Sequence, residues 1–168
     1  MSLDGVMENP SWTAPYWNDQ IAKFKLDELL ASDALLLGRV TYQGFAEAWP
    51  ARTDVAGFAQ RMNSLPKYVV STTLQTAEWN NSTIIKDNVA EEIAKLKQQP
   101  GQNILIGGSC ALTQSLMQQN LIDQYQLLVY PVVLGTGKRL FQEGSTAKLK
   151  LVESKSFSDV VLLTYQPA

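Results

Sequence analysis

Apolar positions follow two alternating spacings along the first two thirds of the chain. Apolar residues three and four apart predict a helix that begins at Asn18 or Asp19 and runs to about Ser32, whereas the continuous apolar runs 34–38 and 104–106 predict buried strands. The same patterns predict helices over 39–48, 55–63, 88–98 and from about 111 onward, and strands over 67–71 and 83–85. Strands that alternate with helices are typical of a parallel sheet with helices on both faces.

The pattern changes after Asp123. Long apolar or alternating runs predict strands over 124–133, 148–157 and 160–166, without intervening helices. These strands are expected to be antiparallel additions at one edge, which makes the sheet mixed. The first 16 residues contain Pro10 and Pro15 and are predicted to form a loop, and Asn88 with Glu91 resembles a capping box at the start of a helix.

Size and charge narrow the class of protein. A chain of 168 residues predicts a single domain, and its 14 basic and 16 acidic residues include no Lys/Arg-rich run, so we expect no nucleic-acid partner. The longest apolar stretch, 127–134, is too short to span a bilayer, so we expect no membrane partner. The start has no signal-peptide pattern and Cys110 is the only cysteine, which together predict a cytoplasmic protein.

Histidine is absent from the chain. Its absence excludes Ser-His and Cys-His nucleophile pairs, imidazole metal sites and, with only one cysteine, a zinc deaminase site. We therefore expect no metal. The chemistry must use carboxylates, Lys, Arg, hydroxyl groups, backbone dipoles or a bound cofactor.

Small and hydroxyl residues follow three of the predicted strands, as Gly38–Thr41, Ser71–Thr73 and Gly107–Ser109. Ligands of parallel sheets bind at the carboxyl ends of strands, and two of these segments open helices, whose free amides favour phosphate. Glycine would let a diphosphate approach the backbone. The alternative is that the glycines only permit a tight turn and that Arg39 is an ordinary exposed side chain. The GxGxxG fingerprint is absent, because "GGSCAL" lacks the third glycine.

Six segments occur in the order of a known family. They are "SLDG" (2–5), "LLLGRVTY" (35–42), "PKYVVSTTL" (66–74), "ILIGGSCAL" (104–112), "LIDQYQLLVYPVVLGTGKRLF" (121–141) and "VVLLTYQP" (160–167). The chain resembles the dihydrofolate reductase-like family, and more closely the reductase domain of bacterial riboflavin biosynthesis with its stand-alone relatives. The resemblance implies an α/β fold, a three-layer α/β/α sandwich with a mixed, mainly parallel sheet.

The resemblance also implies binding of NADPH along the carboxyl edge of the sheet. The positions carried over for the cofactor are Gly38, Arg39, Thr41, Ser71, Thr72, Gly107, Gly108 and Ser109. Among them, Ser71 and Thr72 would lie at the adenosine ribose and its 2′-phosphate. Ser2, Leu3 and Gly5 would contact the substrate, and Asp4 is the candidate general acid of that loop. The alternative for Asp4 is a surface Asp-Gly turn.

The sequence departs from the family in two ways. Family members usually carry a strand before the "SLDG" segment, whereas here that segment begins at residue 2. We therefore expect a single domain over residues 1–168 without the usual first strand, or with another segment in its place. The deaminase half that usually accompanies the reductase is not in the sequence, so the pathway role does not transfer automatically.

Three functional hypotheses follow. The first is an NADPH-dependent reductase of a small heterocycle, a pyrimidine similar to 5-amino-6-(5-phosphoribosylamino)uracil or a pterin. The second is a non-catalytic nucleotide-binding or regulatory protein with a reductase-like fold. The third is a structural dimer module, based on the apolar run 126–134 that would pair between subunits; a homodimer is the expected assembly.

Overall fold

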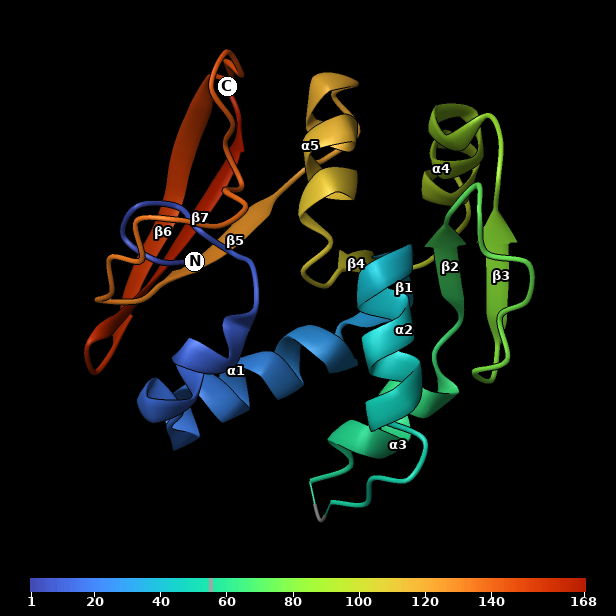
Figure 1. Ribbon diagram of the computed structural model, residues 1–168, viewed down its shortest axis with the longest axis horizontal. Helices are drawn as coiled ribbons and strands as arrows, with labels where there is room; N and C mark the ends of the chain where they lie inside the picture. The colour runs from blue at the N-terminus through green and yellow to red at the C-terminus, as the bar shows by residue number, and fades with distance from the viewer. Residues whose placement is uncertain (55) are drawn as a thin grey trace. The chain divides into compact units, whose positions relative to one another are not determined.

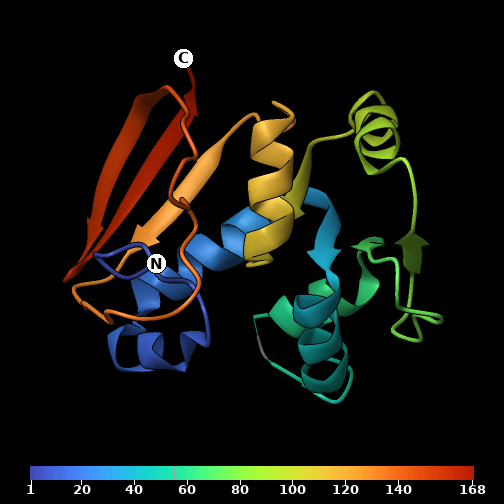
Figure 2. The same cartoon turned by 45° about the horizontal axis from the view of Figure 1, so that its top comes forward.

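The structure is a computed structural model that describes residues 1–54 and 56–168. The chain divides into two compact units. We call residues 23–112 the parallel unit, and residues 1–22 with 113–168 the antiparallel unit, after the sheet that each contains (Figures 1 and 2). The single domain expected over residues 1–168 stays a prediction.

The parallel unit is built on a four-stranded sheet. Its strands are β1 (Ser32–Gly38), β2 (Lys67–Val70), β3 (Ser82–Ile85) and β4 (Asn103–Ile106), in the order β3-β2-β1-β4. All three neighbouring pairs are parallel, and Gly38 lies opposite Val70, which lies opposite Ile85. The predicted strands are confirmed. Because the register is nearly level, the carboxyl ends of the strands meet at one edge.

The helices of this unit also lie near their predicted positions. They are α2 (Arg39–Ala48), α3 (Phe58–Ser64) and α4 (Val89–Lys97), while α1 (Asp19–Leu30) and α5 (Cys110–Gln118) each continue from one unit into the other. The predicted start of α3 at residue 55 lies outside the described residues; the helix begins at Phe58, where the Asp54 carboxylate accepts the amides of Phe58 and Ala59. The capping box at 88–91 is wrong, because Asn88 is left-handed (φ 50°) and makes no side-chain cap bond.

Apolar side chains from α1, β1, α2, α3 and β2, and from the segments on either side of β2, form the core of the parallel unit. The buried members are Leu29, Leu35, Leu37, Tyr42, Met62, Leu65, Val69 and Trp79. Burial of one such side chain contributes about 1.5–3 kcal/mol, so this cluster supplies the main force that holds the helices on the sheet. The tyrosine hydroxyl in the core accepts the backbone amide of Trp79 at 3.0 Å, which satisfies both buried groups.

A lysine is buried at the edge of this core. Lys67 is fully buried, and its Nζ donates to the carbonyl oxygens of Asn63 (3.0 Å), Leu65 (2.8 Å) and Asn80 (3.0 Å). The ammonium also lies 4.2 Å from the centre of the Trp79 ring. It therefore binds carbonyls at the carboxyl end of α3, where the helix dipole favours a cation. Burial lowers the pKa of Lys67 to about 8.

The antiparallel unit holds a separate sheet in the order β5-β7-β6. The strands of this sheet are β5 (Tyr125–Val129), β6 (Leu149–Phe157) and β7 (Val160–Pro167). The unit also contains the 3₁₀ helix η1 (Pro10–Tyr16). An α/β fold with a mainly parallel sheet is confirmed, but the late strands form a sheet of their own rather than the edge of the parallel sheet. β5 is shorter than the predicted 124–133, because Pro131 has no amide to donate to a ladder.

The chain start lies against the edge of β5. The amino group of Met1 donates to the carbonyl oxygen of Leu128, and the amide of Tyr130 donates to the carbonyl oxygen of Met1 at 2.9 Å. Among the described residues, β4 and β5 each have one edge without a strand partner. Met1 therefore occupies one position of the β5 edge, and burial lowers the pKa of its amino group to about 6.

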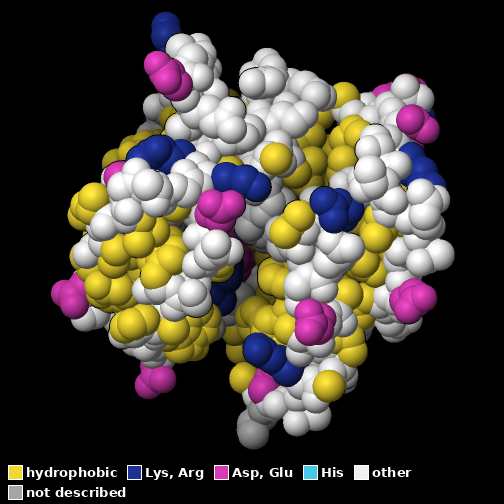
Figure 3. Space-filling model, in the orientation of Figure 1, with side chains coloured by type: hydrophobic (Ala, Val, Ile, Leu, Met, Phe, Trp, Pro, Cys, Tyr) yellow, Lys and Arg dark blue, Asp and Glu magenta, His cyan; other side chains and the backbone are white. Residues whose placement is uncertain are grey.

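Most charged side chains lie on the surface, with both signs mixed. Basic and acidic side chains are interspersed on the face that Figure 3 draws, and ion pairs such as Lys23–Asp27 join well-exposed partners. Such exposed pairs contribute about 0–1 kcal/mol each, so apolar burial rather than surface charge supplies most of the stability within each unit. Within the described residues, no helix has both the length and the apolar character that a membrane crossing requires.

Replacing Lys67 by Met should lower the free energy of unfolding by about 2 kcal/mol at pH 7, because three buried carbonyls lose their donor. The difference from the wild type should then change by up to about 3 kcal/mol between pH 8 and 10.5. In that window the unfolded lysine binds a proton that the folded one has lost, so only the wild type gains stability as the pH rises and the difference widens. Urea unfolding at a series of pH values measures both effects.

The matched control is Lys150→Met on β6, where the side chain is exposed, and it should change stability by less than about 0.5 kcal/mol. A difference between wild type and Lys67→Met that stays constant from pH 7 to 10.5 would contradict the lowered pKa.

Candidate functional site

The segments Gly38–Thr41 and Gly107–Ser109, predicted to bind phosphate, come together at the carboxyl edge of the parallel sheet. There β1 and β4 lie side by side (Figure 1). The Ser109 hydroxyl accepts the amide of Gly38 at 2.9 Å and donates to the carbonyl oxygen of Gly107 at 3.1 Å. The amide of Ser109 in turn donates to Oγ1 of Thr41 at 3.2 Å. The segments that open α2 and α5 are thus bonded directly to each other.

The two adjacent glycines have different roles. Gly108 has φ +60°, a left-handed conformation that side chains rarely adopt, and an added Cβ would lie 3.7 Å from two side-chain atoms of Thr41. Gly107 has an ordinary conformation, and its added Cβ would make an ordinary contact of 3.5 Å with the Phe45 ring. The left-handed backbone therefore favours glycine at position 108, whereas at position 107 only the neighbouring Phe45 ring limits the side chain.

The start of α2 suits an anion. Its N-cap is Gly38, which has no side chain to bond the first amides, and the first turn contains no acidic residue. Arg39 is the first helical residue, exposed, with Nη1 donating to Oε1 of Gln43 at 3.1 Å. A cation at this end of a helix is unfavourable unless an anion offsets the dipole. A diphosphate fits both the amides and the arginine.

Ser71 and Thr72, which follow β2, differ in burial and in hydrogen bonding. The Ser71 hydroxyl accepts the amides of Thr73 (3.2 Å) and Leu74 (2.9 Å), and the residue is buried. It shapes the turn after the strand. Thr72 is exposed, so of these two predicted cofactor residues it is the one whose side chain is accessible.

In the antiparallel unit, Asp4 holds a loop. Its carboxylate accepts the Ser2 hydroxyl (2.7 Å) and the amides of Leu134 (3.1 Å) and Gly135 (2.9 Å). These hydrogen bonds, the one from Ser2 foremost, hold the pKa of Asp4 well below its usual range. An ionised carboxylate does not donate a proton, so the geometry favours an electrostatic and structural part for Asp4; its predicted catalytic role stays a prediction.

The residues predicted to contact substrate differ in exposure. Ser2 is fully buried and its hydroxyl also accepts the amide of Val6 at 2.9 Å. Gly5 has φ +83°, and its carbonyl oxygen accepts the amide of Leu140 at 3.0 Å. Leu3 is 64% exposed. Of the three, Leu3 presents an accessible side chain, while Ser2 and Gly5 keep the loop in shape.

Arg139 lies in the same late segment and bonds to the loop that contains Asp4. Its Nε donates to the carbonyl oxygen of Asp4 at 2.9 Å and its Nη2 to that of Gly135 at 3.0 Å. The same segment contains Gly137 (φ +121°), where a Cβ would lie 2.6 Å from a methyl carbon of Val6. Arg139 therefore ties residues 134–140 to the loop of residues 2–6, a pairing that no local pattern in the sequence signals.

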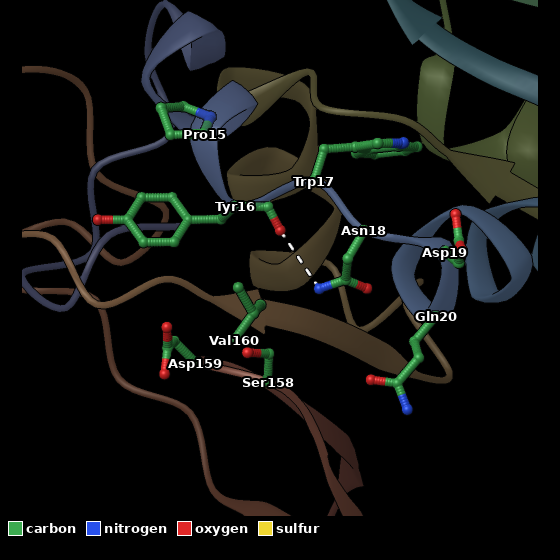
Figure 4. A pocket seen from close by; sticks show the side chains of 9 residues that line it. All are labelled: Pro15, Tyr16, Trp17, Asn18, Asp19, Gln20, Ser158, Asp159 and Val160. Atoms are coloured by element: carbon green, nitrogen blue, oxygen red, sulfur yellow. Dashed lines mark hydrogen bonds between the residues drawn. The ribbon is translucent and has the colours of Figure 1, made fainter.

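A cavity of about 380 Å³ lies elsewhere in the antiparallel unit. It is bounded by residues 15–20 and by the β6–β7 turn at Ser158–Val160. Figure 4 shows the Asn18 amide there, donating to the carbonyl oxygen of Tyr16. None of the predicted cofactor or substrate residues lines this cavity.

The family model of the RibD C-terminal domain matches residues 1–163. The chain belongs to the RibD C-terminal domain family. The Bacillus subtilis protein YyaP is 33% identical to it over 170 residues, which cover 98% of this chain and 90% of YyaP.

Two solved structures share the fold. The deaminase/5-amino-6-(5-phosphoribosylamino)uracil reductase of Thermotoga maritima has a TM-score of 0.69 and 14% identity, covering 99% of this chain and 54% of that one. Dihydrofolate reductase of Enterococcus faecalis, solved with NADP(H) and RAB-propyl, has a TM-score of 0.62 and 14% identity over 99% and 92% of the chains. The predicted dihydrofolate reductase-like fold is confirmed.

Replacing Asp4 by Asn should loosen the loop at residues 134–140, because a neutral amide accepts hydrogen bonds more weakly than a carboxylate. The amides of Leu134 and Gly135 should exchange with solvent faster than in the wild type, and the unfolding temperature at pH 7 should fall. The contribution of Asp4 is present above the usual carboxyl pKa of about 4 and is lost at lower pH. The stability difference should therefore shrink as the pH falls from about 4 towards about 2.

The control is Glu153→Gln on β6, an exposed carboxylate whose removal should leave the exchange of both amides unchanged. Unchanged exchange in Asp4→Asn would mean that Arg139 and Gly137 hold the loop without the carboxylate.

Proposed function

We propose that the protein is an NADPH-dependent reductase of a small heterocycle, a pyrimidine similar to 5-amino-6-(5-phosphoribosylamino)uracil or a pterin. The observation that carries the proposal is the bonded pair of segments Gly38–Thr41 and Gly107–Ser109, which opens two helices at adjacent strand ends. Membership of the RibD C-terminal domain family and the fold shared with two reductases support it.

The residues at the carboxyl edge would hold the cofactor by its phosphates. The first amides of α2 and the guanidinium of Arg39 would meet the diphosphate from one side, and Gly108, which has no side chain, would let the backbone approach it from the other. Ser109 and Thr41 would keep the two helix starts at a fixed separation. When bound, the dihydronicotinamide supplies hydride, and the protein's part is to bind and orient it.

The loop of residues 2–5 would lie beside the substrate. Leu3 would offer its exposed side chain to the face of a flat heterocycle, and the buried Ser2 would keep the loop rigid. Asp4 would act through its fixed negative charge and its hold on Leu134 and Gly135 rather than as an acid. A rigid loop favours turnover, because it lowers the entropy lost on alignment of the reactants.

Calorimetric titration with NADPH tests the proposal. The wild type should bind, and Arg39→Gln should weaken binding about tenfold, because a charge-assisted hydrogen bond to phosphate contributes about 1.5–3 kcal/mol, less when exposed. Lys95→Gln on α4 is the matched control and should bind as the wild type does. Absence of heat with NADPH would refute the proposal.

An absorbance screen of cofactor oxidation over pyrimidines, pterins and flavins then separates catalysis from binding. We expect turnover with a pyrimidine or a pterin. Binding without turnover on any of these heterocycles would favour the alternative of a non-catalytic nucleotide-binding protein.

A further inference from the structure

Two segments far apart in the sequence form a short antiparallel pair within the antiparallel unit. The amide of Met7 donates to the carbonyl oxygen of Lys138 at 2.8 Å, and the amide of Leu140 donates to the carbonyl oxygen of Gly5 at 3.0 Å. The residues between these bonds face each other across an isolated β-bridge. We call this pair, residues 5–7 with 138–140, the clasp.

A buried glutamine of α5 binds the clasp. Gln114 is 9% exposed, and its Nε2 donates to the carbonyl oxygens of Arg139 (2.7 Å) and Leu140 (3.2 Å). The NH₂ group of a side-chain amide has two donors, so it can satisfy both carbonyls at once. Because Gln114 is the fifth residue of α5, these two bonds attach the clasp to a helix.

The charged side chains of the clasp make their contacts at the surface. Lys138 lies 3.6 Å from Glu8 with 72% of its side chain exposed, and Arg139 bonds to the loop of residues 2–5 through exposed contacts. Water weakens exposed contacts of this kind. Loss of the Gln114 donors would instead leave two carbonyls without a donor beside a buried side chain, which is more costly.

We propose that Gln114 is a positioning residue for the substrate. It holds the clasp on α5, and through Gly5 the clasp holds the loop of residues 2–5 in the conformation that receives the heterocycle. The inference rests on the proposed function. A loop that is already ordered loses less entropy when a substrate binds, so Gln114 lowers the KM for the substrate without touching the reacting atoms. It has no part in NADPH binding, because the bonds of Ser109 that join the diphosphate segments do not involve it.

Hydrogen exchange of the free protein tests the anchoring step. Gln114→Met keeps the length of the side chain and removes its donors, so the amides of Met7 and Leu140 should exchange about tenfold faster than in the wild type. Gln114→Lys keeps a donor and should exchange more slowly than Gln114→Met, since Lys67 shows that an amine can satisfy buried carbonyls in this protein. Gln118→Met, at an exposed position of the same helix, is the matched control and should exchange as the wild type does.

Steady-state oxidation of NADPH with 5-amino-6-(5-phosphoribosylamino)uracil, or with the pterin that the absorbance screen identifies, tests the positioning step. Gln114→Met should raise the KM for the heterocycle about fivefold and change kcat by less than about twofold, while the calorimetric affinity for NADPH stays at the wild-type value. A general loss of folded protein would lower kcat and the amount of bound NADPH instead. Gln114→Asn, whose amide is one methylene too short to reach the carbonyls, replaces Gln114→Met if circular dichroism shows that the Met variant has lost the wild-type fold.

The outcomes separate the two proposals. Wild-type exchange of both amides in Gln114→Met, or faster exchange with an unchanged KM, would overturn the role of Gln114 and leave the proposed function intact. A KM that rises equally in Gln118→Met would overturn that role as well. A wild type that oxidises NADPH with none of the heterocycles would overturn the proposed function and the positioning role with it, whatever the exchange shows.

Discussion

The hydrogen bond from the Gly38 amide to the Ser109 hydroxyl holds the candidate site together. It joins the end of β1 to the segment after β4, two parts of the chain separated by 71 positions. The amide of Ser109 returns a bond to Thr41, so neither segment can shift without leaving a polar group unsatisfied. The start of α2, with its first amides, is therefore held in position by hydrogen bonds to the side chains of Ser109 and Thr41. Such preorganisation reduces the cost of ordering a site when the ligand arrives.

The core of the parallel unit also holds the start of α2 in position. Tyr42 lies one residue after Thr41, is buried, and accepts the amide of Trp79. Trp79 in turn covers the ammonium of Lys67, and two of the three carbonyl partners of that lysine, Asn63 and Leu65, lie at the carboxyl end of α3. Tyr42 lies near the start of α2, the end whose amides are the candidate phosphate donors. Its hydrogen bond to Trp79 therefore anchors that end of the helix in the core of the unit. The antiparallel unit uses a different means, in which Asp4 and Arg139 secure two surface segments by ionic and backbone hydrogen bonds.

Much of this arrangement could be predicted from periodicity, because burial on two faces or on one stripe leaves a local pattern. The strands after Pro66 and before Gly107, and the helix that follows Gly38, all lie where the spacing of apolar residues places them. The grouping of the phosphate segments followed from the parallel topology, since parallel strands end at a common edge. The functional difference between Gly107 and Gly108 could not be predicted, because it depends on φ and on a neighbour from another helix. The contact of Arg139 with Asp4 spans 135 positions and leaves no signal in a single sequence. The ladder end at Val129 was missed because apolar side chains continue past Pro131, where backbone pairing stops.

Lys67 has a consequence for handling the protein. Amine-directed reagents modify the neutral form of a lysine, and burial gives Lys67 a larger neutral fraction at mild pH than an ordinary lysine has. The same burial closes the nitrogen off from any reagent while the parallel unit stays folded. Surface attachment or cross-linking through lysines therefore spares this side chain in intact molecules, and a label recovered on it marks chains that had opened before they were modified.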